Sequence, residues 1–287
     1  MSADSVVPFV FESLPVRGAL IQLTASWQRM LEDHDYDVLL RDTLGHAAAA
    51  TGLIAQSLKF DGAVTLQIQG EGALTMLVMQ CSSKLELRGM ATSNAAVQAR
   101  DFSDLVQVAH CAITVDNGER PYQGIVEIHR SSLAASLQNY FDRSVQVPSH
   151  VALVSNGENA CGLLLQQMPG RTAIDEDDWT RLGFIAETLS LADFEAPAGI
   201  ELLRKLFAED DIRVFDAKAV RFNCRCSVGR AEQVLKMLGK AELREALDAL
   251  GHLEVICEYC GKRRYFDSVD VSRLFADNVV VGPDSVQ

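Results

Sequence analysis

The sequence predicts an α+β fold: a mixed α/β core domain with an antiparallel sheet, a helical linker, and a small C-terminal domain built around four cysteines. Three observations predict this architecture. Apolar strands and an alanine-rich helix fill residues 1–170, acidic helical segments occupy 171–223, and a paired cysteine pattern lies within 224–287. A chain of 287 residues is long enough for one large core and a small satellite domain.

The core domain begins its regular pattern with a helix and a meander. Residues 38–58 predict a helix whose alanines allow close packing on most sides. Apolar and polar residues alternate over 64–69, which is typical of a half-buried strand. Gly70-Glu71-Gly72 then turns the chain into a second strand over 74–79. A third strand around Leu85 and Leu87, ending at Gly89, completes an antiparallel meander.

The rest of the core domain predicts more strands and one further helix. The strands are expected over 111–115, 124–128, 151–154 and 162–167. The helix has an apolar face formed by Leu133, Leu137, Tyr140 and Phe141.

Residues 171–223 predict a metastable helical linker. Asp175–Asp178 supply acidic side chains at the start of a helix, where the positive end of the dipole favours them, and Pro197 separates it from a second short helix. Such short helices are stable only while an apolar face is docked. A plain helical extension of the core is an equal alternative. The two apolar stripes consist of Trp179, Leu182, Ala186 and Leu189, and of Ile200, Leu203 and Phe207.

The four cysteines form a C-x-C pair, Cys224 and Cys226, and a C-x-x-C-G pair, Cys257 and Cys260. Four thiolates grouped in this way are the ligands of a closed tetrahedral zinc site, here one ion. Gly261 strengthens the prediction because glycine tolerates the left-handed backbone of a turn around a metal. A disulfide within the C-x-C pair would be strained and labile, so these zinc ligands can also form a redox sensor.

Two other uses of these cysteines stay open. Two structural disulfides would need the same residues, but residues 1–15 lack a signal peptide, no N-x-S/T site occurs, and seven cysteines is an odd number. These features predict an intracellular protein. A purely structural zinc site without switching is the other alternative.

The domain that carries the cysteines is too small for a large core. Helical patterns occur over 231–238 and 243–250, a hairpin is expected over 253–267, and a loose tail follows Phe275. About fifty residues bury little apolar surface, so a bound metal must supply much of the stability.

The charge of the chain limits its partners. The formal net charge is −13, which argues against nucleic acid because phosphate binding needs a concentrated basic face. No apolar run is long enough for a membrane span. The basic run Lys262-Arg263-Arg264, together with Arg225, is expected to offset the negative charge of a zinc–thiolate site rather than bind phosphate.

No enzyme motif is present, and we expect no catalytic residues. Gly70-Glu71-Gly72 joins two strands and lacks the third glycine of a dinucleotide-binding loop. Cys81, Cys111 and Cys161 lie among apolar residues and are interpreted as buried fillers. His110 and Cys111 are adjacent in a strand, so they should point to opposite faces and form no dyad.

Short motifs along nearly the whole chain accompany the cysteine pairs. They are Val16-Arg17-Gly18, Leu58-Lys59-Phe60-Asp61-Gly62, Gln67-Ile68-Gln69-Gly70, Tyr122-Gln123-Gly124, Leu164-Leu165-Gln166-Gln167-Met168-Pro169, Phe222-Asn223-Cys224-Arg225-Cys226-Ser227 and Cys257-Glu258-Tyr259-Cys260-Gly261. With these motifs the chain resembles the redox-regulated thirty-three-kilodalton heat-shock chaperones, the 33 kDa chaperonin family. Asp37 and Val145 depart from the family pattern.

The resemblance implies a bacterial cytoplasmic, ATP-independent holdase. Reduced thiolates would hold zinc in the inactive protein, and oxidation would form the disulfides Cys224–Cys226 and Cys257–Cys260 and release the metal. Unfolded or aggregation-prone client proteins would then bind, and the active form would be a homodimer. A constitutive zinc-ribbon regulator or adaptor that binds a protein or nucleic acid is the alternative function, and an enzyme that uses a cleft in the core is a third.

Overall fold

The computed structural model describes residues 4–94, 98–118, 120–170, 174–194 and 199–276. The chain divides into two compact units, Met1–Asn223 and Cys224–Gln287. The first unit contains two six-stranded sheets and the second a two-stranded hairpin, with helices in both, which confirms the α+β fold class. The separate role assigned to residues 171–223 remains a prediction.

The first sheet has the order β10-β1-β2-β9-β8, and β11 also pairs with β1. The strand pairs of this sheet are antiparallel throughout the described residues. On the outer edge of β1, Pro8 separates two short pairings. Strand β11 pairs with the residues before Pro8, and β10 pairs with the residues after it. The strands are β1 (Ser5–Phe11), β2 (Val16–Leu23), β8 (Ser149–Ser155), β9 (Ala160–Gln167), β10 (Ile212–Val214) and β11 (Lys218–Ala219).

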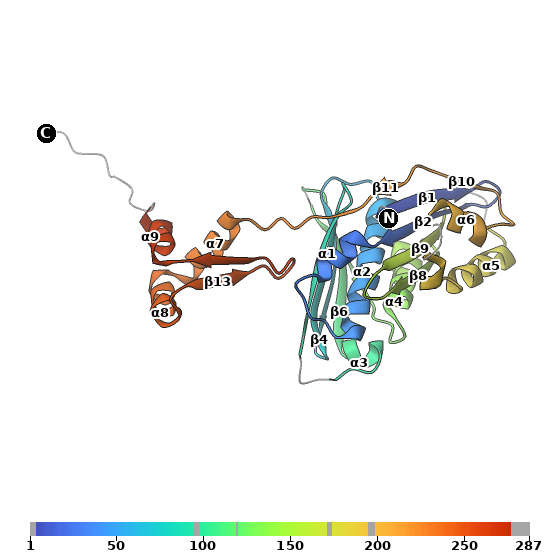
Figure 1. Cartoon of the computed structure of the whole chain (residues 1–287). Helices are drawn as coiled ribbons and strands as arrows, with labels where there is room; N and C mark the ends of the chain where they lie inside the picture. The colour runs from blue at the N-terminus through green and yellow to red at the C-terminus, as the bar shows by residue number, and fades with distance from the viewer. Residues whose placement is uncertain (1–3, 95–97, 119, 171–173, 195–198, 277–287) are drawn as a thin grey trace. The chain divides into compact units, whose positions relative to one another are not determined.

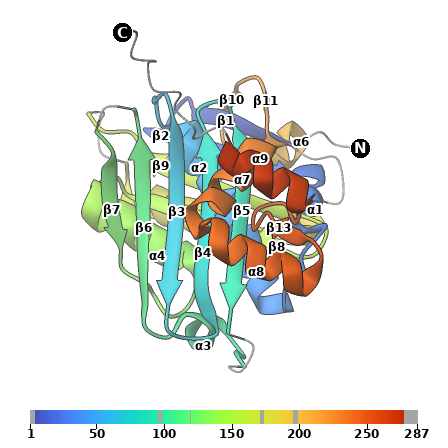
Figure 2. The same ribbon diagram turned by 90° about the vertical axis from the view of Figure 1, so that its left-hand side faces the viewer.

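The second sheet has the order β12-β5-β4-β3-β6-β7, and most of it faces the viewer in Figure 2. Its strands β3, β4 and β5 form the predicted antiparallel meander. The short strand β12 pairs with β5 in parallel. The strands are β3 (Ala63–Gly70), β4 (Leu74–Ser82), β5 (Glu86–Ser93), β6 (Ala109–Asp116), β7 (Tyr122–Val126) and β12 (Arg221–Phe222).

Two predicted strand boundaries in this sheet are wrong. The third strand does not end at Gly89 but continues to Ser93. Gly89 is needed for a close approach, since a Cβ atom there would collide with the side chain of Met79 on β4. The strand expected over 124–128 is shifted toward the N-terminus, because its pairing with β6 begins at Tyr122, opposite Val115.

Helix α2 (Val38–Ser57) lies between the two sheets and forms the centre of the first unit (Figure 1). It confirms the predicted helix, and the Asp37 carboxylate caps its first turn by accepting a hydrogen bond from the Leu39 amide at 3.0 Å. Its central alanines are fully enclosed. The other helices between Asp4 and Gly170 are α1 (Ala25–Leu31), α3 (Phe102–Val106), α4 (Leu133–Tyr140) and the π-helical turn η1 (Phe141–Val145).

A second apolar cluster lies on the opposite face of the first sheet. Helices α5 (Glu176–Glu187) and α6 (Ile200–Leu206), joined in part by the 3-10 turn η2 (Leu191–Phe194), pack there against β1, β2 and β9. The aromatic rings of Phe9, Phe11 and Phe207 meet in this cluster, with centroids 5.1 to 5.8 Å apart. The predicted break at Pro197 lies outside the described residues.

Between Cys224 and Ala276, the described part of the second unit, the chain forms three helices and a hairpin. Both predicted helices and the hairpin are present, and a third helix that was not predicted follows the hairpin. The predicted loose tail lies mostly in 277–287, outside the described residues. No helix in the described ranges is both long and apolar enough to span a lipid bilayer. The elements are α7 (Val228–Leu238), α8 (Lys240–Leu250), β13 (Leu253–Ile256), β14 (Arg263–Phe266) and α9 (Ser268–Ala276).

Candidate metal centre

The C-x-C pair lies in the short chain segment between the end of β12 and the start of α7. On its N-terminal side, the Phe222 amide donates to Ser26 Oγ at 3.0 Å and the Asn223 amide donates to the Leu87 carbonyl at 2.9 Å. On its C-terminal side, Ser227 caps α7 by accepting a hydrogen bond from the Arg230 amide at 3.2 Å. The segment therefore presents two sulfurs between β12 and α7.

The C-x-x-C-G pair forms the turn between β13 and β14. The Cys257 amide donates to the Lys262 carbonyl at 3.1 Å, and the Gly261 amide donates back to the Cys257 carbonyl at 2.8 Å. Gly261 has a φ of +61°, the left-handed conformation expected from the sequence. The turn therefore holds the second pair of sulfurs on its inner side.

The four sulfurs lie together in one cluster. All four Sγ atoms are within 4.8 Å of one another, and the Sγ atoms of Cys224 and Cys257 are 3.6 Å apart, those of Cys226 and Cys260 3.5 Å. Zinc bonded tetrahedrally to four sulfurs at about 2.3 Å would place them about 3.8 Å apart. The cluster therefore has the donor type and spacing of a metal site. No other such group occurs in the part of the chain that the structure describes.

The thiols of the cluster have pKa values shifted in different directions. Desolvation opposes ionisation of Cys226, but hydrogen bonds from Cys260, Cys224 and Arg264 outweigh it and lower its pKa to about 7. Desolvation raises the pKa of Cys224 and that of Cys260. Without a metal, the Cys226 thiol therefore ionises more readily than those of Cys224 and Cys260.

The basic run after the turn has two different contacts. The Arg264 Nη2 atom lies 3.8 Å from Cys226 Sγ, in agreement with a role in offsetting thiolate charge. Arg263 instead pairs with the Glu254 carboxylate on the neighbouring strand at 2.8 Å. The sequence predicted this role for the whole basic run and did not distinguish Arg264 from Arg263. The position of Arg264 could have been inferred from the strand alternation that follows Gly261.

The cluster is partly open to small molecules. Cys260 is buried, while Cys224, Cys226 and Cys257 are partly exposed. Small oxidants can reach such sulfurs. The two short separations join sulfurs of different pairs, Cys224 to Cys257 and Cys226 to Cys260, and the sulfurs within each pair also lie within 4.8 Å of each other.

The three isolated cysteines have the opposite character. Cys81, Cys111 and Cys161 are fully buried in apolar surroundings, and desolvation raises the pKa of each to about 12. His110 is exposed while Cys111 is buried, so the two side chains point to opposite faces of β6 as predicted. These thiols are poor nucleophiles.

Comparison with known proteins gives a consistent result. The sequence model of the family described as Hsp33 protein matches residues 4–267. The 33 kDa chaperonin of Methylobacillus flagellatus is 36% identical over 289 residues, which cover 99% of each chain. The 33 kDa chaperonin of Nitrosococcus oceani is 39% identical over 277 residues, 96% of each. The crystal structure of the 33 kDa chaperonin of Thermotoga maritima, 21% identical, shares the fold with a TM-score of 0.80 over 94% of this chain and 97% of that one.

Proposed function

The chain belongs to the Hsp33 family of 33 kDa chaperonins, and on this premise we propose that it is a redox-regulated, ATP-independent holdase that binds unfolding proteins under oxidative stress. Family membership also confirms that the chain is a chaperone and not an enzyme. The observation that carries the proposal is the cluster of four cysteine sulfurs within 4.8 Å of one another, in a unit with a small apolar core.

In the reduced protein the ligands of one zinc ion would be Cys224, Cys226, Cys257 and Cys260. Bound zinc would keep the four sulfurs deprotonated and contribute on the order of 10–16 kcal/mol to folding of the unit. Arg264 would offset part of the negative charge of the four thiolates. This arrangement corresponds to the inactive state.

Oxidation would convert each sulfur pair into a disulfide. A thiolate attacks a peroxide oxygen and expels hydroxide, which takes a proton from the solvent to become water. The second thiolate then attacks the resulting sulfenic acid, whose hydroxyl group leaves with another solvent proton as a second water. Two peroxides, each accepting two electrons, would thus produce the disulfides Cys224–Cys226 and Cys257–Cys260. The partly exposed sulfurs of Cys224, Cys226 and Cys257 would be open to the oxidant, whereas Cys260 is buried. Disulfide sulfurs no longer bind zinc, so the unit loses its main source of stability.

The consequence for the first unit would come through residues 171–223. One residue, Asn223, separates Cys224 from the end of β12, and β12 pairs with β5 of the second sheet. Helices α5 and α6 bury leucine and phenylalanine side chains on the face of the first sheet that carries Phe9 and Phe11. If these helices separate from the sheet, both apolar surfaces become available to clients or to a second copy of the chain. The active form would be a homodimer in a bacterial cytoplasm.

The test is suppression of aggregation by the reduced and the oxidised protein. A heat-denaturing client is followed by light scattering, with the zinc content and free thiols of the added protein measured beforehand. We expect strong suppression after peroxide treatment with mild heat, together with loss of one zinc per chain, and little suppression before it. A constitutive zinc-ribbon regulator or adaptor would instead bind its partner equally in both states. Equal suppression by both forms would overturn the redox switch.

A further inference from the structure

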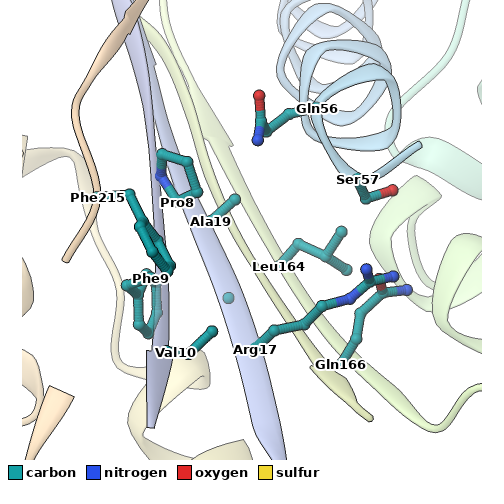
Figure 3. A pocket seen from close by; sticks show the side chains of 11 residues that line it. Pro8, Phe9, Val10, Arg17, Ala19, Gln56, Ser57, Leu164, Gln166 and Phe215 are labelled. Atoms are coloured by element: carbon teal, nitrogen blue, oxygen red, sulfur yellow. The ribbon is translucent and has the colours of Figure 1, made fainter. Parts of the chain in front are cut away.

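A pocket on the first sheet lies just beyond the C-terminal end of α2 (Figure 3). Its volume is about 170 Å³, similar to cavities that admit one benzene-sized molecule. The floor is apolar and comes from β1, β2 and β9, while the last turn of α2 supplies Gln56 and Ser57 along one side, and Phe215 lies at the rim. The apolar floor residues are Pro8, Val10, Ala19 and Leu164.

Among the described residues that line this pocket, Arg17 is the only charged one. Its Nη2 atom donates to Gln166 Oε1 at 2.9 Å, and the enclosed Nε atom has no hydrogen-bond partner. No ion pair to Arg17 occurs among the described residues, although the chain carries 39 acidic residues. Desolvation lowers the pKa of Arg17, but an arginine remains charged at neutral pH. The pocket therefore contains a partly buried cation without a counter-charge.

An anionic ligand would relieve this imbalance. A guanidinium that has lost part of its hydration gains most from a carboxylate, which matches its planar donors and forms short charge-assisted hydrogen bonds. The apolar floor adds a second requirement, because a small hydrated anion would leave it uncovered. The neutral amides of Gln56 and Gln166 add polar groups without adding negative charge.

We propose that this pocket binds a carboxylate attached to a small branched or aromatic apolar group. The carboxylate contacts the Arg17 guanidinium, and the apolar group covers the floor formed by β1, β2 and β9. Two sources share this chemistry: a free apolar carboxylic acid, and the C-terminal carboxylate of a polypeptide that ends in an apolar residue. The site lies within the first unit.

The experiment uses the reduced full-length protein and two isosteric probes, 4-methylpentanoate and the uncharged 4-methylpentanamide, at constant ionic strength. Calorimetry and thermal unfolding report binding, since a ligand specific to the folded state raises the Tm. We expect saturable binding of the acid and at least tenfold weaker binding of the amide. Equal binding of both probes, or no binding of the acid, would overturn the proposal.

Variants test whether the pocket is the binding site. Arg17→Gln removes the charge, and Val10→Phe fills the pocket from the position paired with Arg17 while leaving the charge in place. Each should weaken binding of the acid at least tenfold, whereas Arg204→Gln, at an exposed arginine of α6, should leave it unchanged. Val10→Phe decides the question if Arg17→Gln does not fold. Unchanged binding in a folded pocket variant would contradict the assignment.

Peptides distinguish the two sources of carboxylate. N-acetyl-Ala-Ala-Leu with a free carboxylate is compared with the same peptide carrying a C-terminal amide. Binding of the free-acid peptide alone identifies polypeptide ends as ligands. Binding of 4-methylpentanoate without binding of either peptide identifies free carboxylic acids. Both outcomes support the carboxylate pocket.

Discussion

The two units of the chain are stabilised in different ways. In the first, two sheets enclose α2, and apolar clusters occupy both faces of the sheet that carries β1 and β2. In the second, the described core consists of eight buried apolar residues: Ala231, Leu235, Leu243, Leu247, Leu253, Phe266, Val271 and Leu274. A core of this size contributes little net stability. The first unit therefore buries a much larger apolar core than the second, and on the proposed function the second unit would depend on its cysteine cluster.

Helices within the first unit also differ in how much of their surface is buried. Helix α2 is buried on most sides, whereas α5 buries one stripe and leaves Phe184 64% exposed. A helix docked by one face can separate from the sheet without opening the core around α2. On the proposed function, α5 and α6 are the helices expected to separate from the sheet after oxidation.

The largest effect is expected from removal of one sulfur of the cluster. Cys226→Ser should abolish tight zinc binding and unfold α7–α9, because three ligands and eight apolar residues cannot replace the four-sulfur site. Metal analysis after treatment with a chelator and limited proteolysis measure the two effects. Cys81→Ala removes a sulfur outside the cluster and should retain zinc. Full zinc retention by Cys226→Ser would rule out Cys226 as a ligand.

The next largest effect concerns docking of α6. Leu203 is fully buried between α6 and the sheet, so Leu203→Gly should destabilise the docked helix by about 3–5 kcal/mol. We expect the variant to retain zinc and to suppress client aggregation already in the reduced state. Arg204→Gly has the same backbone cost at the next, exposed position and provides the control. A Leu203→Gly protein that stays inactive until oxidised would show that α6 does not control client binding.

A smaller effect is expected from loss of an ion pair between α5 and the segment that follows α6. Arg181 on α5 forms two hydrogen bonds, of 2.9 and 2.7 Å, with the carboxylate of Asp210, which follows α6. Only 7% of the Asp210 side chain is exposed, so Arg181→Met leaves a carboxylate without its partner and should cost about 1–3 kcal/mol. Proteolysis within 174–216 should become faster in the reduced state. An unchanged rate would assign the pair no role in docking.

The smallest effect concerns pH. The His150 ring stacks on Trp179 of α5 at 4.1 Å, and desolvation lowers its pKa despite the opposing Trp179 carbonyl and the charges of Asp142 and Glu187. The undocked state then binds a proton more readily, so docking of α5 should weaken as pH falls below 6.5. Protease sensitivity of α5 measured between pH 8 and 5.5 tests this dependence. His150→Gln should remove the pH dependence, and a variant that retains it would exclude His150 as its origin.

Local sequence patterns predicted those elements whose geometry is set by local chemistry. The alanines of α2, the alternation in β3, and Gly261 at its left-handed turn all have short-range causes. The clustering of the four sulfurs was predicted because two closely spaced cysteine pairs are typical of the four ligands of one zinc ion.

Features that depend on tertiary contacts could not be predicted. Gly89 resembles a strand end but accommodates Met79 of the neighbouring strand. Pro8 makes the segment of β1 look unlike a strand in the sequence, because proline has no amide to donate to a neighbouring strand. The structure accommodates it because β10 and β11 pair with the residues after and before Pro8. The pocket at Arg17 likewise arises from three strands and a helix end that are distant in the sequence.

Hydrogen exchange of the full-length protein, reduced with zinc and then oxidised, tests the central claim most directly. Oxidation should remove protection from the amides of α7–α9 and from those of α5 and α6. The amides of α2, β3 and β4 should remain protected, because their burial does not involve the cysteines. The same sample should gain the ability to suppress client aggregation. An oxidised, active protein in which α7–α9 keep full protection would contradict the account.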